Sequence, residues 1–372
     1  MKRRFLTMIT VAVSSLAAIA QPYPTTDNIV RLTEQNMPAV EYFTAEKVKL
    51  PEIYANAEYH IYNDDIAIII NYTNPQPFVI TFYNLNTKKI IAGFFKKGEL
   101  RMASGQMRCN DFIVTDGILH TVSRFNIDSV LVDGFAYTPT VTQFGTTYAS
   151  SLVYVDENTI AMPNSQYITG DFGVEGLPEF LLCNAKTGKP LTDYKQNNKN
   201  FPSNLTQRSI AYCNSKYVAF WHCFPIITIY DKDFNLVKMY RDDKFEDPEV
   251  AESKMGQQSS YLSVKGFASF FRFDCQTDNY IIAANGRNLI TGAEVMKKGG
   301  IKWVESPQYF DRFKDAEIWC FDNDMNLVRR YKCKNKIGII LKVSYNEKTE
   351  NLFIAAKDAN GEVSLYRCKF NK

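Results

Sequence analysis

The sequence predicts an all-β fold, a six-bladed β-propeller whose last blade is completed by an N-terminal strand. Two recurring sequence patterns lead to this prediction. One is a strand, a polar turn and a strand, and the other is a strand, a polar corner and a short apolar strand that comes ahead of it. Both recur along the chain at intervals typical of stacked or circular repeat architectures. The incomplete last repeat then predicts how the ring is closed.

The N-terminus has the pattern of a secretory signal peptide. Lys2, Arg3 and Arg4 precede an uncharged run over residues 5–20 that ends in small residues, Ala18 and Ala20. This run is shorter than the roughly 20 residues of a membrane-spanning helix, and no cysteine follows it to carry a lipid. We therefore expect a signal peptide over residues 1–20 and a single domain over residues 21–372. The location predicted is periplasmic or secreted, with no transmembrane segment after the signal is removed.

Charge and composition argue against two classes of protein, nucleic-acid-binding proteins and disordered chains. The formal net charge of +3 falls to zero without the signal, which carries three positive charges and no negative one. Nucleic-acid binding needs a surplus of Lys and Arg on one face, so nucleic acid is not expected as a partner. A chain with 45% hydrophobic and 14% aromatic residues also has enough apolar surface to fold into a packed core.

The strand–turn–strand pattern is clearest over residues 226–237 and 316–328. Weaker copies cover residues 78–95, 120–132 and 180–194. The first two copies share the spacing Asp-x-Asp-x-Asn, beginning at Asp231 and at Asp322. A calcium loop that opens in this way needs Gly at its sixth position and Glu at its twelfth, where Leu236 and Asp242 stand. Short Asx side chains bond their own backbone in tight turns, so each copy predicts a hairpin.

The strand–corner–strand pattern precedes these hairpins in the sequence. Its six copies lie over residues 62–68, 109–114, 154–161, 212–219, 273–282 and 344–354. Alternating or fully apolar strands on both sides of a polar corner indicate paired antiparallel strands. Six corners with their hairpins predict six four-stranded units.

The sixth unit lacks a fourth strand. Residues 362–370 supply its third strand, and the chain then stops at Lys372. An unfilled position would leave a bare strand edge, which propellers commonly avoid by using a strand from the other terminus. Residues 41–50 precede the first unit and have no partner in it. We expect them to complete the last blade.

Two insertions interrupt the repeats, over residues 242–261 and 286–314, and the first is expected to contain a short helix. In a propeller both would emerge on one face, which predicts a loop-rich binding surface there. The candidate ligand-binding residues on this face are Trp221, His222, Trp303 and Tyr309. The alternative is that these side chains pack beneath their own loops.

The cysteines are scattered over strand positions. We expect most of them to be free and buried, and we regard Cys213 with Cys223 and Cys320 with Cys333 as the pairs nearest each other. The full set is Cys109, Cys183, Cys213, Cys223, Cys275, Cys320, Cys333 and Cys368.

The corners and hairpins, including Ile229-Tyr230-Asp231 and Cys320-Phe321-Asp322-Asn323, resemble those of TolB-like six-bladed propeller proteins exported into Gram-negative envelopes. The resemblance covers roughly residues 41–370. Many relatives carry a Gly-rich phrase after the first hairpin, where this chain has only Gly98 and Gly105. The resemblance implies a non-enzymatic interaction or sensing role and no catalytic residues.

Motifs of catalysis and cofactor binding are absent from the sequence. It contains no His-Glu-x-x-His, Gly-x-Ser-x-Gly, phosphate-binding Gly-rich loop or Cys-x-x-Cys. Its three histidines, His60, His120 and His222, fall in different units, so no metal site and no cofactor are predicted. We expect a monomeric, non-catalytic protein that binds an envelope protein or a glycan. The alternative is a propeller hydrolase or lyase, with a divalent metal held in the central channel by carboxylates from several blades.

Overall fold

The fold is all-β, which confirms the predicted class. The computed structural model describes residues 23–51, 54, 57–71, 77–101, 103–144, 151–164, 179–191, 207–255, 259–264, 266–304 and 306–370. The predicted signal peptide over residues 1–20 lies outside this part of the chain. Among the described residues, no helix is both long enough and apolar enough to cross a membrane.

Most strands belong to groups in which consecutive strands pair antiparallel. The first group contains β3 (Glu58–Asn63), β4 (Ile66–Ile70), β5 (Ile80–Asn84) and β6 (Lys89–Phe94). The second contains β7 (Ala103–Arg108), β8 (Asp111–Asp116), β9 (Thr121–Asn126) and β10 (Thr140–Gln143). The third contains β11 (Val153–Tyr154), β12 (Thr159–Pro163) and β13 (Phe180–Asn184).

The later groups follow the same plan. The fourth contains β14 (Arg208–Cys213), β15 (Lys216–Trp221), β16 (Ile226–Tyr230) and β17 (Leu236–Asp242). The fifth contains β20 (Gly266–Gln276), β21 (Tyr280–Thr291), β22 (Glu317–Asp322) and β23 (Leu327–Cys333). The last contains β24 (Ile339–Asn346), β25 (Asn351–Lys357) and β26 (Val363–Phe370).

The two clearest predicted hairpins have the same turn chemistry. Oδ1 of Asp231 accepts hydrogen bonds from the backbone N–H groups of Asp233 and Asn235, each at 2.9 Å. Oδ1 of Asp322 accepts the equivalent bonds from Asp324 and Asn326 at 3.0 and 2.8 Å. These aspartates satisfy turn backbone, so the hairpin interpretation is confirmed at both positions.

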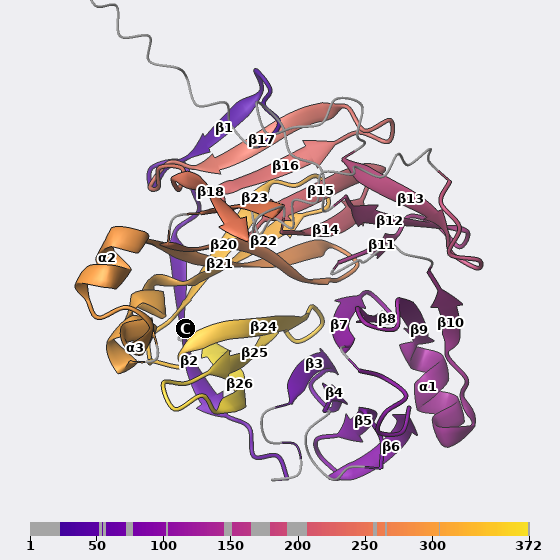
Figure 1. Cartoon of the computed structure of the whole chain (residues 1–372). Helices are drawn as coiled ribbons and strands as arrows, with labels where there is room; N and C mark the ends of the chain where they lie inside the picture. Colours follow the sequence, from indigo (N-terminus) through magenta and orange to yellow (C-terminus); the bar gives the residue numbers. More distant parts are fainter. Residues whose placement is uncertain are drawn as a thin grey trace, which may run out of the picture.

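The first strands of the groups lie nearest a common centre, with the later strands further out (Figure 1). Side-chain oxygens of one group accept backbone N–H groups from the first strand of the next. Ser151 Oγ accepts from Ile210, Ser209 Oγ from Phe273 and Ser344 Oγ from Ile61, at 3.1, 2.7 and 2.9 Å. Because these bonds are buried, they fix the register between neighbouring groups.

Two strands from different groups pair with each other near the common centre. β7 and β20, from the second and fifth groups, pair in parallel through Met107 with Cys275 and Arg108 with Gln276. The N–H of Cys109 extends the pairing with a 2.7 Å bond to the carbonyl of Gln276. These two groups are therefore held directly against each other at this level of the axis.

The N-terminal segment joins three groups. β1 (Ile29–Leu32) pairs in parallel with β17, and β2 (Val40–Lys47) pairs in parallel with β23 and antiparallel with β26. β2 thus lies between the fifth and last groups, within residues where the sequence predicts a strand. Phe43 on β2 is completely buried in the largest hydrophobic cluster.

A buried charge network holds the turn between β1 and β2. Glu317 is 4% exposed, and its carboxylate contacts Arg287 Nη1 at 2.6 Å and Arg330 Nε at 2.9 Å. Glu34, in the turn, accepts from Arg287 Nη1 at 3.2 Å and from Arg330 Nη1 at 3.0 Å. Asp242 lies 3.2 Å from Arg287 Nε. Two guanidinium groups are thereby matched by three carboxylates.

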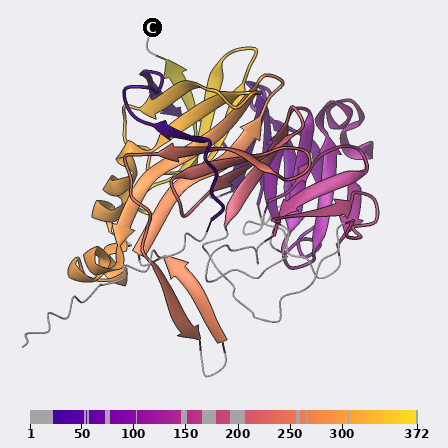
Figure 2. The same ribbon diagram turned by 90° about the horizontal axis from the view of Figure 1, so that it is seen from above.

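The two insertions differ from each other in structure. The first contains the hairpin β18 (Val250–Met255) and β19 (Ser259–Val264), which projects from the body of the molecule in Figure 2, so the expected short helix was wrong. Strand alternation over a short segment is easily mistaken for a helical turn. The second contains α2 (Gly292–Lys297), α3 (Ile301–Val304), α4 (Pro307–Phe310) and the 3-10 helix η5 (Asp311–Asp315).

The predicted hairpin around Asn126 was also wrong. β9 ends at Asn126, and the chain enters α1 (Ile127–Asp133) before β10. Oδ1 of Asn126 accepts the N–H of Ser129 at 3.0 Å and so caps the helix. The same Asx side chain that makes a tight turn also makes a good helix N-cap, which is why the local pattern misled the prediction.

All eight cysteines are free thiols, six of them buried, as expected for most of them. Cys213 and Cys223 lie beyond opposite ends of β15. Cys320 is the register partner of Arg329, four residues before Cys333 at the end of β23. Both suggested pairs are therefore wrong. The hairpin geometry separates residues that are close in sequence.

Gly105 on β7 provides a test of packing at the axis. An added Cβ would lie 2.5 Å from Nε2 of His60 and 2.6 Å from Cζ of Phe112, both buried. We expect Gly105→Ala to lower the free energy of unfolding by about 1–3 kcal/mol, because an overpacked core must shift. Urea unfolding measures this change. Ser104→Ala, at an exposed position on the same strand, should change it by less than about 0.5 kcal/mol.

Candidate functional site

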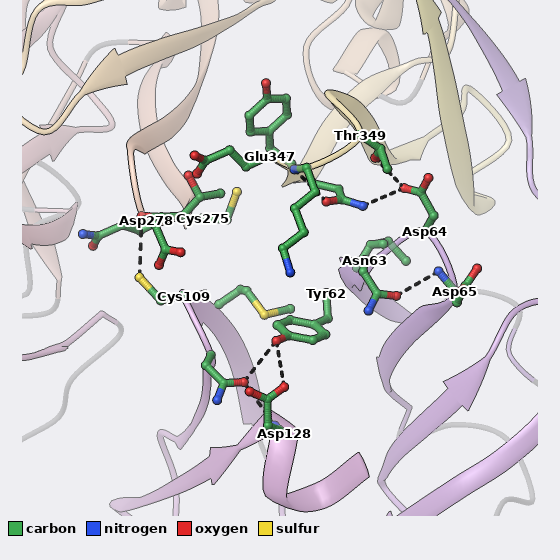
Figure 3. A pocket seen from close by; sticks show the side chains of 18 of the residues that line it. Tyr62, Asn63, Asp64, Asp65, Cys109, Asp128, Cys275, Asp278, Glu347 and Thr349 are labelled. Atoms are coloured by element: carbon green, nitrogen blue, oxygen red, sulfur yellow. Dashed lines mark hydrogen bonds between the residues drawn. The ribbon is translucent and has the colours of Figure 1, made fainter. Parts of the chain in front are cut away.

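A cavity of about 940 Å³ opens where the first strands of four groups turn into their second strands (Figure 3). We call it the corner cavity. Its walls come from the corners after β3, β7, β20 and β24, together with the start of α1. They are formed by Ile61, Tyr62, Asn63, Asp64, Asp65, Met107, Cys109, Asn110, Asp128, Leu131, Cys275, Gln276, Thr277, Asp278, Tyr345, Asn346, Glu347, Lys348 and Thr349.

The cavity wall is acidic. It carries five carboxylates against one ammonium group, that of Lys348. The carboxylates are Asp64, Asp65, Asp128, Asp278 and Glu347. They come from four groups of strands, with Asp64 and Asp65 in one corner, so folding brings together negative charges that are far apart in the sequence. Like charges gathered in a concave surface raise the local concentration of oppositely charged ligands.

Asp64 has a structural role in this wall. Its carboxylate accepts hydrogen bonds from Asn346 Nδ2 at 3.0 Å and from Asn351 Nδ2 at 2.7 Å, and it forms an ion pair with Arg367 at 3.2 Å. All three partners belong to the last group, whereas Asp64 follows β3 of the first. Asp64 therefore ties the first group to the last at the edge of the cavity.

Two other carboxylates are oriented by neutral donors. The Tyr62 hydroxyl lies 3.0 Å from Oδ1 of Asp128 and 3.2 Å from Oδ1 of Asn110. Burial, followed by the bond to Asp128, raises the pKa of Tyr62 to about 12, so this hydroxyl remains protonated at neutral pH. Burial opposes ionisation of Glu347, but hydrogen bonds from Asn279 and Thr277 outweigh it and hold the pKa of Glu347 below its usual range. Glu347 is therefore negatively charged at neutral pH.

Gln276 belongs to the same wall, but its side-chain amide is directed toward the fourth group of strands. Its side chain is 7% exposed, and Nε2 donates to the carbonyl of Tyr212 at 3.3 Å. Oε1 is buried and has no hydrogen-bond partner within the part of the chain that the structure describes. An unpaired buried acceptor costs about 1–3 kcal/mol. Because this oxygen has no accessible surface, it does not face the cavity.

Beyond the cavity the axis is lined by paired charges. Nε2 of His60 lies 2.7 Å from Oε1 of Glu58, which also accepts the N–H of Gly105 at 3.0 Å. Burial lowers the pKa of His60, while the bonds from His60 and Gly105 outweigh burial and lower the pKa of Glu58. The pair therefore consists of a neutral imidazole and a carboxylate.

Two cations also lie along this axis. Arg272 forms a two-point pair with Asp274 at 2.9 and 3.1 Å, and Lys342 Nζ donates to the carbonyl of Gly105 at 3.0 Å. Burial, then Arg272 and Lys342, lowers the pKa of His222 to about 3, so His222 is neutral at physiological pH. The described residues contain no group of three His, Cys, Asp or Glu side chains that could hold a metal ion. The charges of Arg272 and Lys342 also disfavour a divalent cation between them.

The predicted ligand-binding residues lie in two separate places. Trp221 and His222 are at the end of β15. Trp221 is completely buried and donates to Thr228 at 3.0 Å, and His222 lies 3.3 Å from Ser209 Oγ. Trp303 and Tyr309 are 7% and 9% exposed, with ring centroids 5.5 Å apart.

Trp303 and Tyr309 pack inside the second insertion, in a cluster with Ile290, Val295 and Phe313. This arrangement matches the alternative that they pack beneath their own loops. The structure does not bring the four predicted residues together, and a ligand-binding role for them stays a prediction.

Sequence reasoning did not identify the corner cavity, although it identified every corner that forms it. The corners were used only to predict strand pairing, and no role was assigned to their aspartates and asparagines. The signal that could have identified the cavity is the position of the corners in the order of strands. Corners that follow first strands must emerge at one end of an array of antiparallel strands, so their acidic residues converge on one face.

No family model and no curated protein matches the chain. A predicted exported protein from Bacteroides fragilis is similar in structure, with a TM-score of 0.47, 10% identity and coverage of 92% of this chain and 100% of the other. A member of the DUF4221 family from Bacteroides vulgatus has a TM-score of 0.42 and 11% identity, over 95% of this chain and 96% of the other. BamB from Moraxella catarrhalis has a TM-score of 0.36 and 10% identity, over 94% and 98%. None of these similarities assigns the chain to a family, and membership of the TolB-like group stays a prediction.

Proposed function

We propose that this chain is an exported, six-bladed β-propeller that binds a partner without catalysing a reaction, and that the partner docks at the corner cavity. Each group of consecutive antiparallel strands is one blade in this proposal. β2 provides the additional strand of the last blade, which is supported by its pairing with β26. The bonds from Ser344 and Asp64 support a junction between the last blade and the first.

The observation that carries this proposal is the corner cavity itself. It is a concave surface of about 940 Å³ to which four groups of strands contribute acidic or amide side chains. Ligand sites are usually concave, with a few polar groups from several elements placed around an apolar wall. Ile61, Met107 and Leu131 supply such apolar surface here.

The proposed role is binding because the carboxylates along the axis, Glu58 and Asp274, are already hydrogen-bonded. Glu58 is bonded to His60 and Gly105, and Arg272 is bonded to Asp274. General acid–base or nucleophilic catalysis needs a reactive group within hydrogen-bond reach of its activating partner and open to substrate. No observation favours the metal-dependent hydrolase or lyase, and the cations near the axis argue against it.

The signal peptide pattern supports a periplasmic or secreted location, and an envelope protein is the proposed partner. A glycan partner would require exposed aromatic rings on which sugars stack. Trp221, Trp303 and Tyr309 are buried. The carboxylates of the corner cavity are better suited to charged groups of a protein.

Capture of partners from envelope extract tests the proposal. The mature chain would be compared with Asp128→Asn/Asp278→Asn, which removes two charges from the cavity while keeping side-chain size. A matched control is Glu99→Gln/Glu294→Gln, which removes two charges from connections at the opposite ends of the strands, one after β6 and one in α2. We expect a specific partner that the cavity variant loses and the control retains. A partner retained equally by both variants would overturn the proposal.

A further inference from the structure

We propose that a second pocket, at the opposite ends of the strands from the corner cavity, binds a fatty carboxylate of medium chain length. We call it the insertion pocket. Its volume is about 460 Å³, and its walls come from within residues 307–316 of the second insertion, residues 333–340 around the connection between β23 and β24, the turn at residues 358–359, and Tyr366. It shares no lining residue with the corner cavity, so this inference goes beyond the proposed function and does not rest on it.

Much of the wall of the insertion pocket is apolar. Phe313 and Ile337 line it and are 8% and 5% exposed. Phe313 belongs to the hydrophobic cluster of the second insertion, whereas Ile337 belongs to the largest hydrophobic cluster of the molecule. Phe310 and Ile340, which are partly buried, add further apolar surface. The pocket therefore lies where two separately packed clusters meet.

The connection between β23 and β24 is fixed on both sides. The side chain of Asn335 bonds to the N–H and the C=O of Ala45 on β2, at 2.9 and 3.0 Å. Gly338 has a φ of 92°, and a side chain at this position would collide with the carbonyl of Lys357 on β25. Because this part of the wall is already ordered, a ligand loses little affinity to ordering it.

The charged residues of the wall leave an excess of positive charge. Three lysines and two aspartates line the pocket. Lys336 Nζ pairs with Asp311 at 2.7 Å, and the carboxylate of Asp358 accepts backbone N–H groups of its own turn. Lys314 and Lys334 are exposed, and neither forms a salt bridge with a described residue. Their ammonium groups are therefore available to an anion.

An apolar wall beside available ammonium groups suits a ligand with a hydrocarbon body and one anionic end. The carboxylate would accept hydrogen bonds from the lysines, and the body would bury apolar surface. The formal charge of the lining is +1, which one carboxylate balances, whereas a phosphate monoester carries about −1.5 to −2 at neutral pH.

The size of the insertion pocket fits such a ligand. A cavity of roughly 150 Å³ holds one benzene ring, so a pocket of about 460 Å³ has room for a chain of about eight to ten carbons. A neutral ligand of this length would gain the apolar contacts only. A short carboxylate would gain the charged contacts only.

Isothermal titration of the mature chain with octanoate, octanol and acetate tests the inference. We expect one octanoate to bind per chain, octanol to bind at least about fivefold more weakly, and acetate to show no detectable binding. Raising the salt concentration from about 0.05 to about 0.5 M should weaken octanoate binding about two- to fivefold, because exposed charges are screened. The same change should not weaken octanol binding.

Variants locate the site. We expect Lys314→Gln/Lys334→Gln to weaken octanoate binding about fivefold, to remove its salt dependence and to leave octanol binding unchanged. Phe310→Ala should weaken binding of octanoate and octanol alike, by about three- to tenfold. The matched control is Lys186→Gln/Lys232→Gln, which removes two exposed charges from turns at the other ends of the strands and should change neither affinity. Because all four lysines are exposed, both double variants should unfold in urea like the wild type.

Two kinds of result would overturn the inference. One is absence of octanoate binding, or equal affinity for octanoate and octanol. The other is an octanoate affinity that Lys314→Gln/Lys334→Gln leaves unchanged, because the ligand would then lie elsewhere. Capture of an envelope partner at the corner cavity is measured with different variants, so the proposed function and this inference can fail separately.

Discussion

Replacing Glu317 by glutamine is expected to lower the free energy of unfolding by about 3–5 kcal/mol, because it removes the buried carboxylate that contacts both buried guanidinium groups. Glu317 is bonded to Arg287, Arg330 and Trp319, with the Trp319 Nε1 donor at 2.8 Å. Glutamine would also direct N–H donors toward arginine donors. Urea unfolding followed by tryptophan fluorescence measures the loss.

Glu46→Gln is the matched control. Glu46 pairs with Lys369 at 2.8 Å, but both side chains are more than half exposed, so this change should cost less than about 1 kcal/mol. Burial opposes ionisation of Glu317, but Arg330 and Arg287 outweigh it and lower its pKa. Because that stabilisation is present above the unfolded-state pKa and lost as pH falls through the folded-state pKa, the difference between wild type and Glu317→Gln should shrink in acid. Equal stability of the two proteins at neutral pH would contradict this account of the network.

Truncating Phe43 to alanine is expected to cost about 3–5 kcal/mol, the usual loss when a fully buried aromatic side chain is removed. Phe43 is completely buried although it lies on β2, more than 280 residues from its neighbours on β23 and β26. Its ring packs in the same cluster as residues of the first, second and last groups. The N-terminal strand therefore contributes to the central core.

Tyr42→Ala tests whether this cost comes from burial. Tyr42 is the preceding residue on β2, is 48% exposed and lies with its ring centroid 6.0 Å from Lys334 Nζ. We expect it to cost less than about 1 kcal/mol. Similar losses for the two variants would argue against the placement of β2 in the core.

The sequence was most informative where structure depends on local chemistry. Asp231 and Asp322 make the turns expected of Asx residues, and paired strands lie on both sides of each turn as predicted. The pairing of an N-terminal strand with the last group was predicted by counting strands, which needs no knowledge of distance. β1 was missed because a short strand pairing in parallel with β17 leaves no local turn signal.

The candidate site was harder to predict for a physical reason. The function of a corner carboxylate depends on which corners meet in space, and this is set by the arrangement of the groups of strands. Asp64 illustrates the ambiguity, because it does serve a structural purpose by binding Asn346 and Asn351. The sequence-based prediction of ligand binding selected large aromatic residues instead. Of these, Trp303 and Tyr309 are buried in a hydrophobic cluster of their own insertion.

The corner cavity includes residues of the first and last groups of strands, and in the proposed fold β2 closes the ring by pairing with β26. Ala45 on β2 is the register partner of Cys368 on β26, and both side chains are buried. The N–H and C=O of Ala45 bond to Asn335, at 2.9 and 3.0 Å, on the side away from β26. Ala45 and Cys368 are therefore a non-hydrogen-bonded pair, whose Cα separation of about 4.5 Å suits a disulfide.

The most direct test of closure is oxidation of Ala45→Cys followed by mass spectrometry of the proteolytic peptides. We predict a disulfide between position 45 and Cys368, absent from Ala45→Cys/Cys368→Ser. Thr44→Cys should not form it, because its side chain points to the opposite face of the strand. A protein that folds and keeps position 45 and Cys368 as separate thiols under oxidising conditions would contradict closure of the ring by the N-terminal strand.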